Sequence, residues 1–325
     1  MFREAHGSMN FYVKLSYDFF KTLKLDKDSL TQYRIEAATI TAQSIGNKIA
    51  LCFSGGADSQ CMVQCFAEAK IPFDLYILKF KNDLNKQDCD HAIKYCNRFN
   101  IDYNIIEIDV LSFLSRENNE YGLKYKSPSP HFNTHYKLFD ILRSKGYDGV
   151  VAGGNAYFYS SIDNGFLPNS NRNCFNYITY SNINEFKCQG NFLSFYPKLA
   201  WAISLLSPMI DYKLNDAIEF NEQERNYWEY RRYVQKIQGY KRAGFNIIPQ
   251  NQKYTGFELV KKYLEEKTGD GWTFERLYRH PLEKLMPRYY TFAGQFIYQD
   301  PRTKELIDSI YSDNLLPGQG SSSGI

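Results

Sequence analysis

The chain lacks the long apolar runs that cross membranes, and no apolar segment near its start indicates secretion. Its seven cysteines are an odd number and show none of the spacings of a disulfide framework. The formal net charge is only +3, which is too small to indicate a nucleic-acid partner by itself. Together these absences predict a cytoplasmic protein with reduced thiols and no membrane association.

Several nucleotide and metal motifs are also missing. No Gly-Lys-Ser/Thr triplet completes a Walker A loop, and no Gly-x-Gly-x-x-Gly pattern marks a dinucleotide-binding turn. His131 and His135 have the spacing of helical metal ligands, but no Glu lies between them as a zinc protease requires. Cys174 and Cys188 form no Cys-x-x-Cys pair, which disfavours a zinc or iron–sulfur site. Metal binding by the histidines stays a minor alternative, as does a thiol pair for sulfur transfer.

The most informative segment that is present is Ser54–Ser59, Ser-Gly-Gly-Ala-Asp-Ser. The apolar run of residues 49–53 predicts a buried strand before it, and residues 59–69 have helical spacing after it. Glycines in such a turn accept positive φ and let a ligand approach the backbone. Amide groups then gather at the positive end of the helix dipole, where anions bind. The segment therefore predicts an anion-binding loop, although a Gly-Gly turn can also be purely structural.

At this motif the chain resembles the PP-loop ATP pyrophosphatase family, also called the adenine nucleotide α-hydrolase-like superfamily, whose members share Ser-Gly-Gly-x-Asp-Ser. The resemblance implies that the loop holds the pyrophosphate end of ATP, with Mg²⁺ as the accompanying cation. A second, looser element has Pro208 followed by apolar residues, Lys213 and Asp216. The resemblance covers residues 48–220.

The candidate site residues follow from the predicted strand ends, where ligands of wound sheets bind. We expect nucleotide binding by Phe53, Ser54, Gly55, Gly56, Ala57, Asp58, Ser59, Lys79, Phe80, Gly153, Gly154 and Asn155. The candidate catalytic residues are Asp58, Lys79 and Lys213, and the candidate Mg²⁺ ligands are Asp58 and Asp211. Each lysine either reaches phosphate oxygens or is a solvated surface residue, and the Gly153-Gly154 pair either contacts the α-phosphate or only ends a strand.

The order of elements predicts an α/β fold: a doubly wound, mainly parallel five-stranded sheet of the HUP/Rossmann-like type with a C-terminal helical domain. Strands are expected at residues 48–53, 73–80, 103–110 and 149–152, and helices at 28–44, 59–69, 86–99 and 134–145. The chain is predicted to have four parts. These are a helical lead-in (9–46), a nucleotide-binding domain (47–220) with a lid or insertion at 153–200, a helical substrate or accessory domain (221–317) and a flexible tail (318–325).

The leading functional hypothesis is an adenylating enzyme that splits ATP into AMP and pyrophosphate. It would activate a carbonyl or carboxylate for attack by ammonia, supplied from solution or by a partner, or by another amine. The first alternative is sulfur chemistry, as RNA thiolation or sulfonucleotide reduction; no cysteine follows Cys188, which counts against the reductase version. The second is a non-catalytic ATP-binding protein.

RNA is a further candidate partner that the sequence does not favour. Basic and aromatic residues alternate between Arg225 and Arg242, a composition that can bind RNA by phosphate contact and stacking. Three glutamates dilute that charge, and a solvated helix with a buried aromatic stripe explains the pattern better. The sequence identifies neither the acceptor nor the oligomeric state.

Overall fold

The computed structural model describes residues 8–15, 17–153, 156–161, 165–170, 173–190, 192–207, 233–250, 257–271, 273–286 and 291–298, together with 302, 305, 306 and 309. No helix within these ranges is both long and apolar enough to traverse a lipid bilayer.

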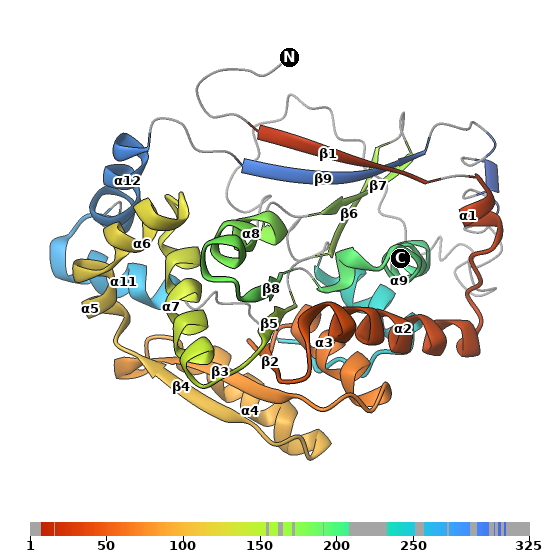
Figure 1. The fold of residues 1–325 in the computed structure, drawn as a ribbon, viewed down its shortest axis with the longest axis horizontal. Coiled ribbons are helices and arrows are strands. Elements are labelled where there is room, and N and C mark those ends of the chain that lie inside the picture. Colours follow the sequence, from red (N-terminus) through yellow and green to blue (C-terminus); the bar gives the residue numbers. More distant parts are fainter. Residues whose placement is uncertain are drawn as a thin grey trace, which may run out of the picture.

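A five-stranded parallel sheet forms the centre of the molecule, as the sequence predicts (Figure 1). Its spatial order is β4-β3-β2-β5-β8. The strands are β2 (Ile49–Cys52), β3 (Asp74–Phe80), β4 (Asn104–Ile108), β5 (Gly149–Ala152) and β8 (Lys187–Gln189). The chain builds outward from β2 through β3 to β4 and then returns to add β5 on the other side. The order therefore reverses between β2 and β5, the position at which wound sheets bind ligands beyond their carboxyl ends.

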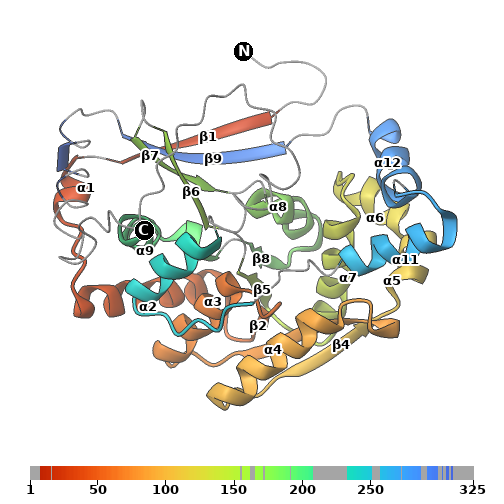
Figure 2. The same ribbon diagram turned by 180° about the vertical axis from the view of Figure 1, so that it is seen from behind.

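Helices cover both faces of this sheet (Figures 1 and 2). On each face an apolar cluster lies between the helices and the sheet. The first face carries α2 (Lys27–Ile45), α3 (Ala57–Glu68), α4 (Lys86–Phe99) and α9 (Pro197–Leu206). The second carries α5 (Val110–Arg116), α6 (Asn118–Tyr125), α7 (Pro130–Ser144), α8 (Asn173–Asn184) and α11 (Glu258–Thr268). The short helix α1 (Tyr17–Lys21) packs Phe20 into the first cluster.

Local signals account for the helix positions that the sequence predicts correctly. Helix α2 begins after Asp26, whose side chain accepts a hydrogen bond from Ser29 N, and α7 begins at Pro130, which has no N–H to satisfy. Helix α4 ends at Asn100 in the left-handed conformation, as a C-terminal cap does. The expected helices at 28–44, 59–69, 86–99 and 134–145 are confirmed to within a few residues.

The predicted lid is wrong for residues 173–190. Helix α8 packs the aromatic side chains of Tyr177 and Tyr180 into the second cluster, and β8 completes the central sheet beside β5. The segment is rich in aromatic residues because it forms the core. Between β5 and α8, strands β6 (Ala156–Ser161) and β7 (Gly165–Ser170) form an antiparallel hairpin.

A second sheet, which the sequence analysis missed, lies beside the first and has the order β1-β9-β7-β6 (Figure 1). Strand β1 (Ser8–Leu15) pairs in parallel with β9 (Thr291–Tyr298), so two segments that are far apart in the sequence lie side by side here. The expected lead-in at 9–46 is therefore not wholly helical, and the expected C-terminal helical domain contains a strand. Because β1 and β9 are far apart in the sequence, no short stretch of the sequence indicates that they pair.

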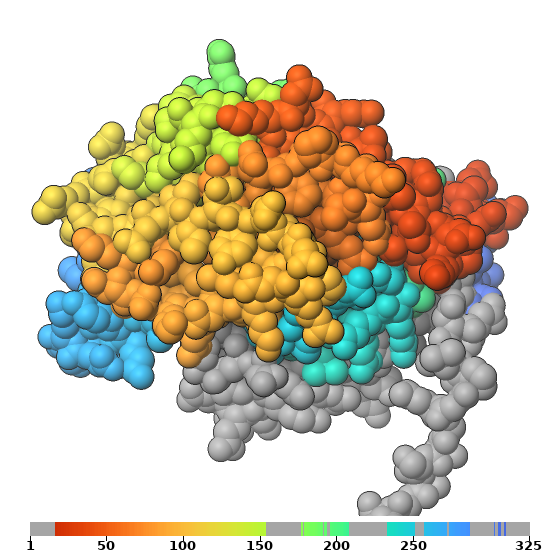
Figure 3. Space-filling view, turned by 90° about the horizontal axis from the view of Figure 1, so that it is seen from below, coloured from red at the N-terminus to blue at the C-terminus, as the bar shows by residue number. Residues whose placement is uncertain are grey.

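The described C-terminal helices do not gather in one body. Residues 233–248 pack into the first cluster, whereas residues 257–286, which include α11 and α12 (His280–Leu285), pack beside α6 and α7. Figure 3 shows the teal segment of residues 233–250 against the orange surface of α3 and α4, away from the light-blue α11. The predicted domain boundary at 221 therefore does not separate two packing units in this part of the chain.

Candidate active site

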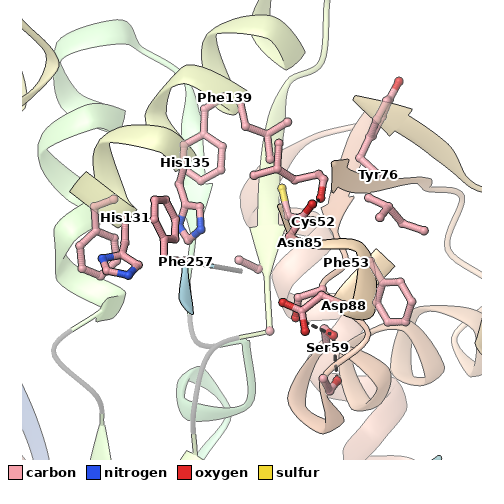
Figure 4. Close-up of a pocket in the computed structure, with 18 of the residues that line it drawn as sticks. Cys52, Phe53, Ser59, Tyr76, Asn85, Asp88, His131, His135, Phe139 and Phe257 are labelled. Carbon is pink, nitrogen blue, oxygen red and sulfur yellow. Dashed lines mark hydrogen bonds between the residues drawn. The ribbon is translucent and has the colours of Figure 1, made fainter. Parts of the chain in front are cut away.

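A cavity of about 510 Å³ lies at the carboxyl edge of the sheet, where the strand order reverses (Figure 4). This volume is within the range of small-molecule sites. Its walls include the residues that follow β2 and β5, and the beginnings of α3 and α7. Of the predicted nucleotide-binding residues, the lining includes Phe53, Ser54, Gly56, Asp58, Ser59, Phe80 and Gly153.

The loop between β2 and α3 has the geometry that its glycines predict. Gly55 has φ +73°, and a Cβ there would lie 2.8 Å from Ala92 N, so this position needs glycine twice over. Gly56 caps α3 without any side-chain hydrogen bond, and a Cβ there would meet only Ser54 Oγ, at 3.5 Å. The first amide groups of α3 have no partner inside the helix. This is the environment that binds an anion.

The loop is braced by its serines and by the end of β5. Ser59 Oγ donates a hydrogen bond to Gly56 O at 2.8 Å, and the hydroxyls of Ser54 and Ser59 are 3.4 Å apart. Gly153 packs so closely that a Cβ there would lie 2.6 Å from Ser59 N. Ala57 is the buried first residue of α3 and does not line the cavity. The ring of Phe53, the residue before the loop, packs on the ring of Tyr95.

Asp58 contacts two residues that the sequence analysis did not assign to the site. Its carboxylate forms an ion pair with Lys236 Nζ and accepts a hydrogen bond from the Tyr240 hydroxyl. The side chains of Asp58 and Lys236 are each only 10% exposed, so water screens this pair poorly. Lys236 thus brings a positive charge to the N-terminus of α3, beside the loop of residues 54–59.

Two glutamines of α3 hold the segment that carries Lys236. Gln60 donates to Ile248 O at 2.9 Å and accepts from Ile248 N at 2.8 Å, and the same amide donates to Gly55 O at 2.7 Å. One turn later, Gln64 accepts from Asn246 N at 2.7 Å and donates to Gly244 O at 3.0 Å. Both side chains thus satisfy the backbone of residues 244–248, and Gln60 also connects that backbone to the loop.

Lys79 does not reach the site. Side chains alternate along a strand, so Phe80 and Leu78 face the cavity whereas Lys79 lies on the opposite face of β3. There its ammonium lies 3.4 Å from both Asp83 Oδ1 and Glu107 Oε2. The role proposed for Lys79 in phosphate binding has no support in this placement.

The side of the cavity formed by α7 is built from rings. It contains His131, Phe132, His135 and Phe139 of α7, Tyr177 of α8 and Phe257 at the start of α11. Burial lowers the pKa of His131 to about 3, and burial likewise lowers the pKa of His135 to about 4. Both imidazoles are therefore neutral near pH 7. Figure 4 shows them with Phe257 on one side of the cavity, and Phe53, Ser59 and Asp88 on the other.

Four candidate site residues lie outside the described residues: Gly154, Asn155, Asp211 and Lys213. Their predicted roles stay predictions. The described residues contain no group of three side chains that could hold a metal ion. Both oxygens of Asp58 already contact Lys236 and Tyr240, so a Mg²⁺ ion on this carboxylate would share it with an ammonium and a hydroxyl group.

The cysteines of the described core are unreactive thiols. Burial raises the pKa of Cys52 to about 12 and holds the pKa of Cys61, Cys65 and Cys188 well above the usual value. A thiol attacks as its thiolate, so these side chains are poor nucleophiles at neutral pH. Cys61 and Cys65 pack in the first cluster.

The site residues that sequence reasoning missed carried weak signals. Lys236 lies one turn before Tyr240 on the buried aromatic stripe, and a lysine on a buried face requires an acidic partner. Nothing local indicates that the partner is Asp58. The spacing of His131 and His135 suggests metal ligands, whereas their position in the first turns of α7 places them on a cavity at the strand ends.

Comparisons with known proteins gave matches among solved structures alone. No family model matches the chain, and no curated protein matches its sequence. The U34-tRNA thiolase NcsA from Methanococcus maripaludis with its [4Fe-4S] cluster is 14% identical, with a TM-score of 0.35, and the match covers 79% of this chain and 81% of that one. The NH3-dependent NAD synthetase from Campylobacter jejuni is 13% identical, with a TM-score of 0.32 and coverage of 92% and 100%. The NMN synthetase from Francisella tularensis is 13% identical, with a TM-score of 0.31 and coverage of 69% and 99%.

Proposed function

We propose that this chain is an ATP-dependent adenylating enzyme of the PP-loop type, which splits ATP into AMP and pyrophosphate while activating an acceptor. The observation that carries the proposal is the loop of residues 54–59. It joins the carboxyl end of β2 to the N-terminus of α3, where Gly56 is the cap and no side chain accepts the first amide groups, and it lines a cavity of nucleotide size. The motif resemblance supplies the reaction type, and the loop geometry supplies a place for the phosphates.

The terminal phosphates of ATP fit the loop by charge and by hydrogen bonding. Free amide groups at the start of α3 and the Ser54 hydroxyl are donors, and the helix dipole favours negative charge. Lys236 adds an ammonium close by. Such preorganised donors stabilise the charge that develops on a leaving pyrophosphate. Nucleotidyl transfer needs little more from a protein than this and correct positioning of the reactants.

With the β- and γ-phosphates in the loop, the α-phosphate faces the cavity and an acceptor oxygen can attack it. The new P–O bond forms as the bond to the bridging oxygen breaks, and pyrophosphate leaves. An amine then attacks the activated carbon of the adenylate, loses a proton to solvent, and displaces AMP together with the former acceptor oxygen.

Mg²⁺ enters this scheme as part of the substrate, the magnesium complex of ATP. Mg²⁺ on nucleotides keeps waters and phosphate oxygens and takes one or two protein carboxylates. Two carboxylates line the cavity, Asp58 and Asp88, and the first is paired with Lys236. We therefore assign no protein-held Mg²⁺ position.

Sulfur transfer and RNA binding have less support than adenylation. Sulfur transfer through Cys188 is disfavoured because burial raises the pKa of its thiol well above the usual value. RNA binding through the basic segment loses Lys236, which is buried against Asp58. A non-catalytic ATP-binding protein would use the same loop, and only the reaction products distinguish it.

The decisive measurement is isotope exchange between pyrophosphate and ATP, with carboxylates, amides and RNA offered in turn as acceptors. The matched variants are Gly56→Ala, which places a methyl group in the open loop at an allowed φ, and Gly271→Ala on the surface. We expect acceptor-dependent exchange with AMP as the nucleotide product, lost in Gly56→Ala and kept in Gly271→Ala. ADP as the product, or exchange that Gly56→Ala leaves unchanged, contradicts the proposal.

A further inference from the structure

We propose that the α7 side of the cavity is a subsite for an uncharged heteroaromatic ring, which His131 and His135 recognise by hydrogen bonds and the surrounding aromatic side chains enclose. Its relation to a reaction rests on the proposed function, whereas the binding of a ring does not.

The two imidazoles have polar atoms that are available to a ligand. No hydrogen bond joins either nitrogen of His131 to any residue that the structure describes. His135 uses Nδ1, which lies 2.8 Å from the Tyr177 hydroxyl, and its Nε2 has no partner within the same ranges. A neutral imidazole offers one donor and one acceptor. The wall therefore presents both kinds of group to an occupant.

The aromatic rings on this side of the cavity contact one another through faces and edges. His131 lies 4.1 Å from Phe257 between ring centroids, with the planes tilted by 55°, and Phe139 meets Tyr177 edge-on at 5.0 Å. Phe132 meets Tyr177 in the same edge-on manner, at 5.8 Å. Aromatic faces and edges of this kind favour a planar ring over an aliphatic chain. Stacking on aromatic side chains is also how proteins commonly hold nucleobases.

The charge of the cavity lining also restricts the occupant. Among the described lining residues, the only charged side chains are Asp58 and Asp88, and both come from the opposite side, at the starts of α3 and α4. Burial keeps both histidines neutral, and the charged groups that act on His131, namely Lys261, Glu275 and Arg279, do not line the cavity. Placing a charged group there would cost solvation without compensation. An uncharged ring with hydrogen-bonding edges meets all three conditions.

The ring has two sources: the base of the bound nucleotide, or a ring of the acceptor. Both present the same chemistry to the wall, and binding measurements distinguish them. Four nucleosides (adenosine, guanosine, cytidine and uridine) probe the ring subsite without phosphate, and tripolyphosphate probes the loop without a ring. The full-length protein is used, with saturation-transfer NMR and calorimetry as readouts.

Two variants remove the polar atoms with little change of shape. His131→Phe keeps a ring against Phe257 and removes both nitrogens, and His135→Asn keeps a polar atom for Tyr177 and removes Nε2. The exposed His280 provides the matched control, His280→Phe. We expect at least one nucleoside to bind the wild type, and each site variant to weaken that nucleoside roughly tenfold, as the loss of one or two neutral hydrogen bonds does. Tripolyphosphate affinity should not change in either.

The affinity for ATP then identifies the source. If His131→Phe weakens ATP by the same factor, the ring is the base of the nucleotide. If ATP affinity is unchanged, the ring belongs to the acceptor. The inference is overturned if no nucleoside shows saturable binding at millimolar concentration, or if both variants bind nucleosides as the wild type does. Failure of the proposed function would instead appear as loss of tripolyphosphate binding, or as Gly56→Ala without effect on it.

Discussion

Replacement of Lys236 by methionine removes the positive charge that faces Asp58 while keeping a side chain of similar length. Both side chains are about nine-tenths buried, so the variant leaves a carboxylate without its counterion. Breaking one side of a buried ion pair destabilises proteins by about 3–5 kcal/mol. The Tyr240 hydroxyl and the positive end of α3 still face Asp58, so we expect the lower value, about 3 kcal/mol.

A thermodynamic cycle separates this ion pair from packing effects. The free energy of unfolding is measured by urea denaturation for the wild type, Lys236→Met, Asp58→Asn and the double variant. Asp58→Asn keeps an acceptor for Tyr240 and removes the charge, so the double variant should recover much of the loss. We expect a coupling free energy of about 2 kcal/mol or more, within the range measured for residues in contact.

The same variants test the role of Lys236 at the phosphate loop. The double variant differs from Asp58→Asn only by the missing ammonium, so its tripolyphosphate affinity should be roughly tenfold lower than that of Asp58→Asn, as loss of a charge-assisted hydrogen bond predicts. A coupling free energy below about 0.5 kcal/mol, the level of independent sites, would refute the ion-pair reasoning. Equal tripolyphosphate affinity in Asp58→Asn and in the double variant would refute the phosphate role of Lys236.

Three further predictions follow from the same geometry. Gly55→Ala should lower the free energy of unfolding by at least about 2 kcal/mol, since it combines positive φ with a backbone contact at Ala92, whereas Gly271→Ala should change it by less than about 0.5 kcal/mol in the same urea titration. Lys79→Ala should leave tripolyphosphate affinity unchanged in calorimetry, because its ammonium lies across β3 from the cavity, and a tenfold loss would show that the lysine reaches the phosphates. Burial lowers the pKa of His131, so the unfolded chain binds the proton first; the free energy of unfolding should fall by up to about 1.4 kcal/mol per pH unit below about pH 6.5, and a pH titration of His131→Phe should show a shallower fall.

Much of the loop of residues 54–59 was predictable because its conformation is determined locally. Two glycines between an apolar run and a helical repeat produce the turn at residues 54–59 wherever the chain forms a wound sheet. The four strands and four helices that the sequence predicts in this domain likewise follow from short-range periodicity and from caps such as Asp26 and Pro130.

Tertiary structure alone decided which charged and aromatic groups face that loop. Lys79 pairs with acidic residues away from the cavity, and packing of a segment far along the chain brought Lys236, separated from Asp58 by 178 positions, against that carboxylate. The fifth strand β8 and the parallel pairing of β1 with β9 were hidden for the same reason. Contacts between distant residues depend on which surfaces pack against each other. The short-range periodicity of the sequence predicts helices and strands but does not indicate which of them pack together.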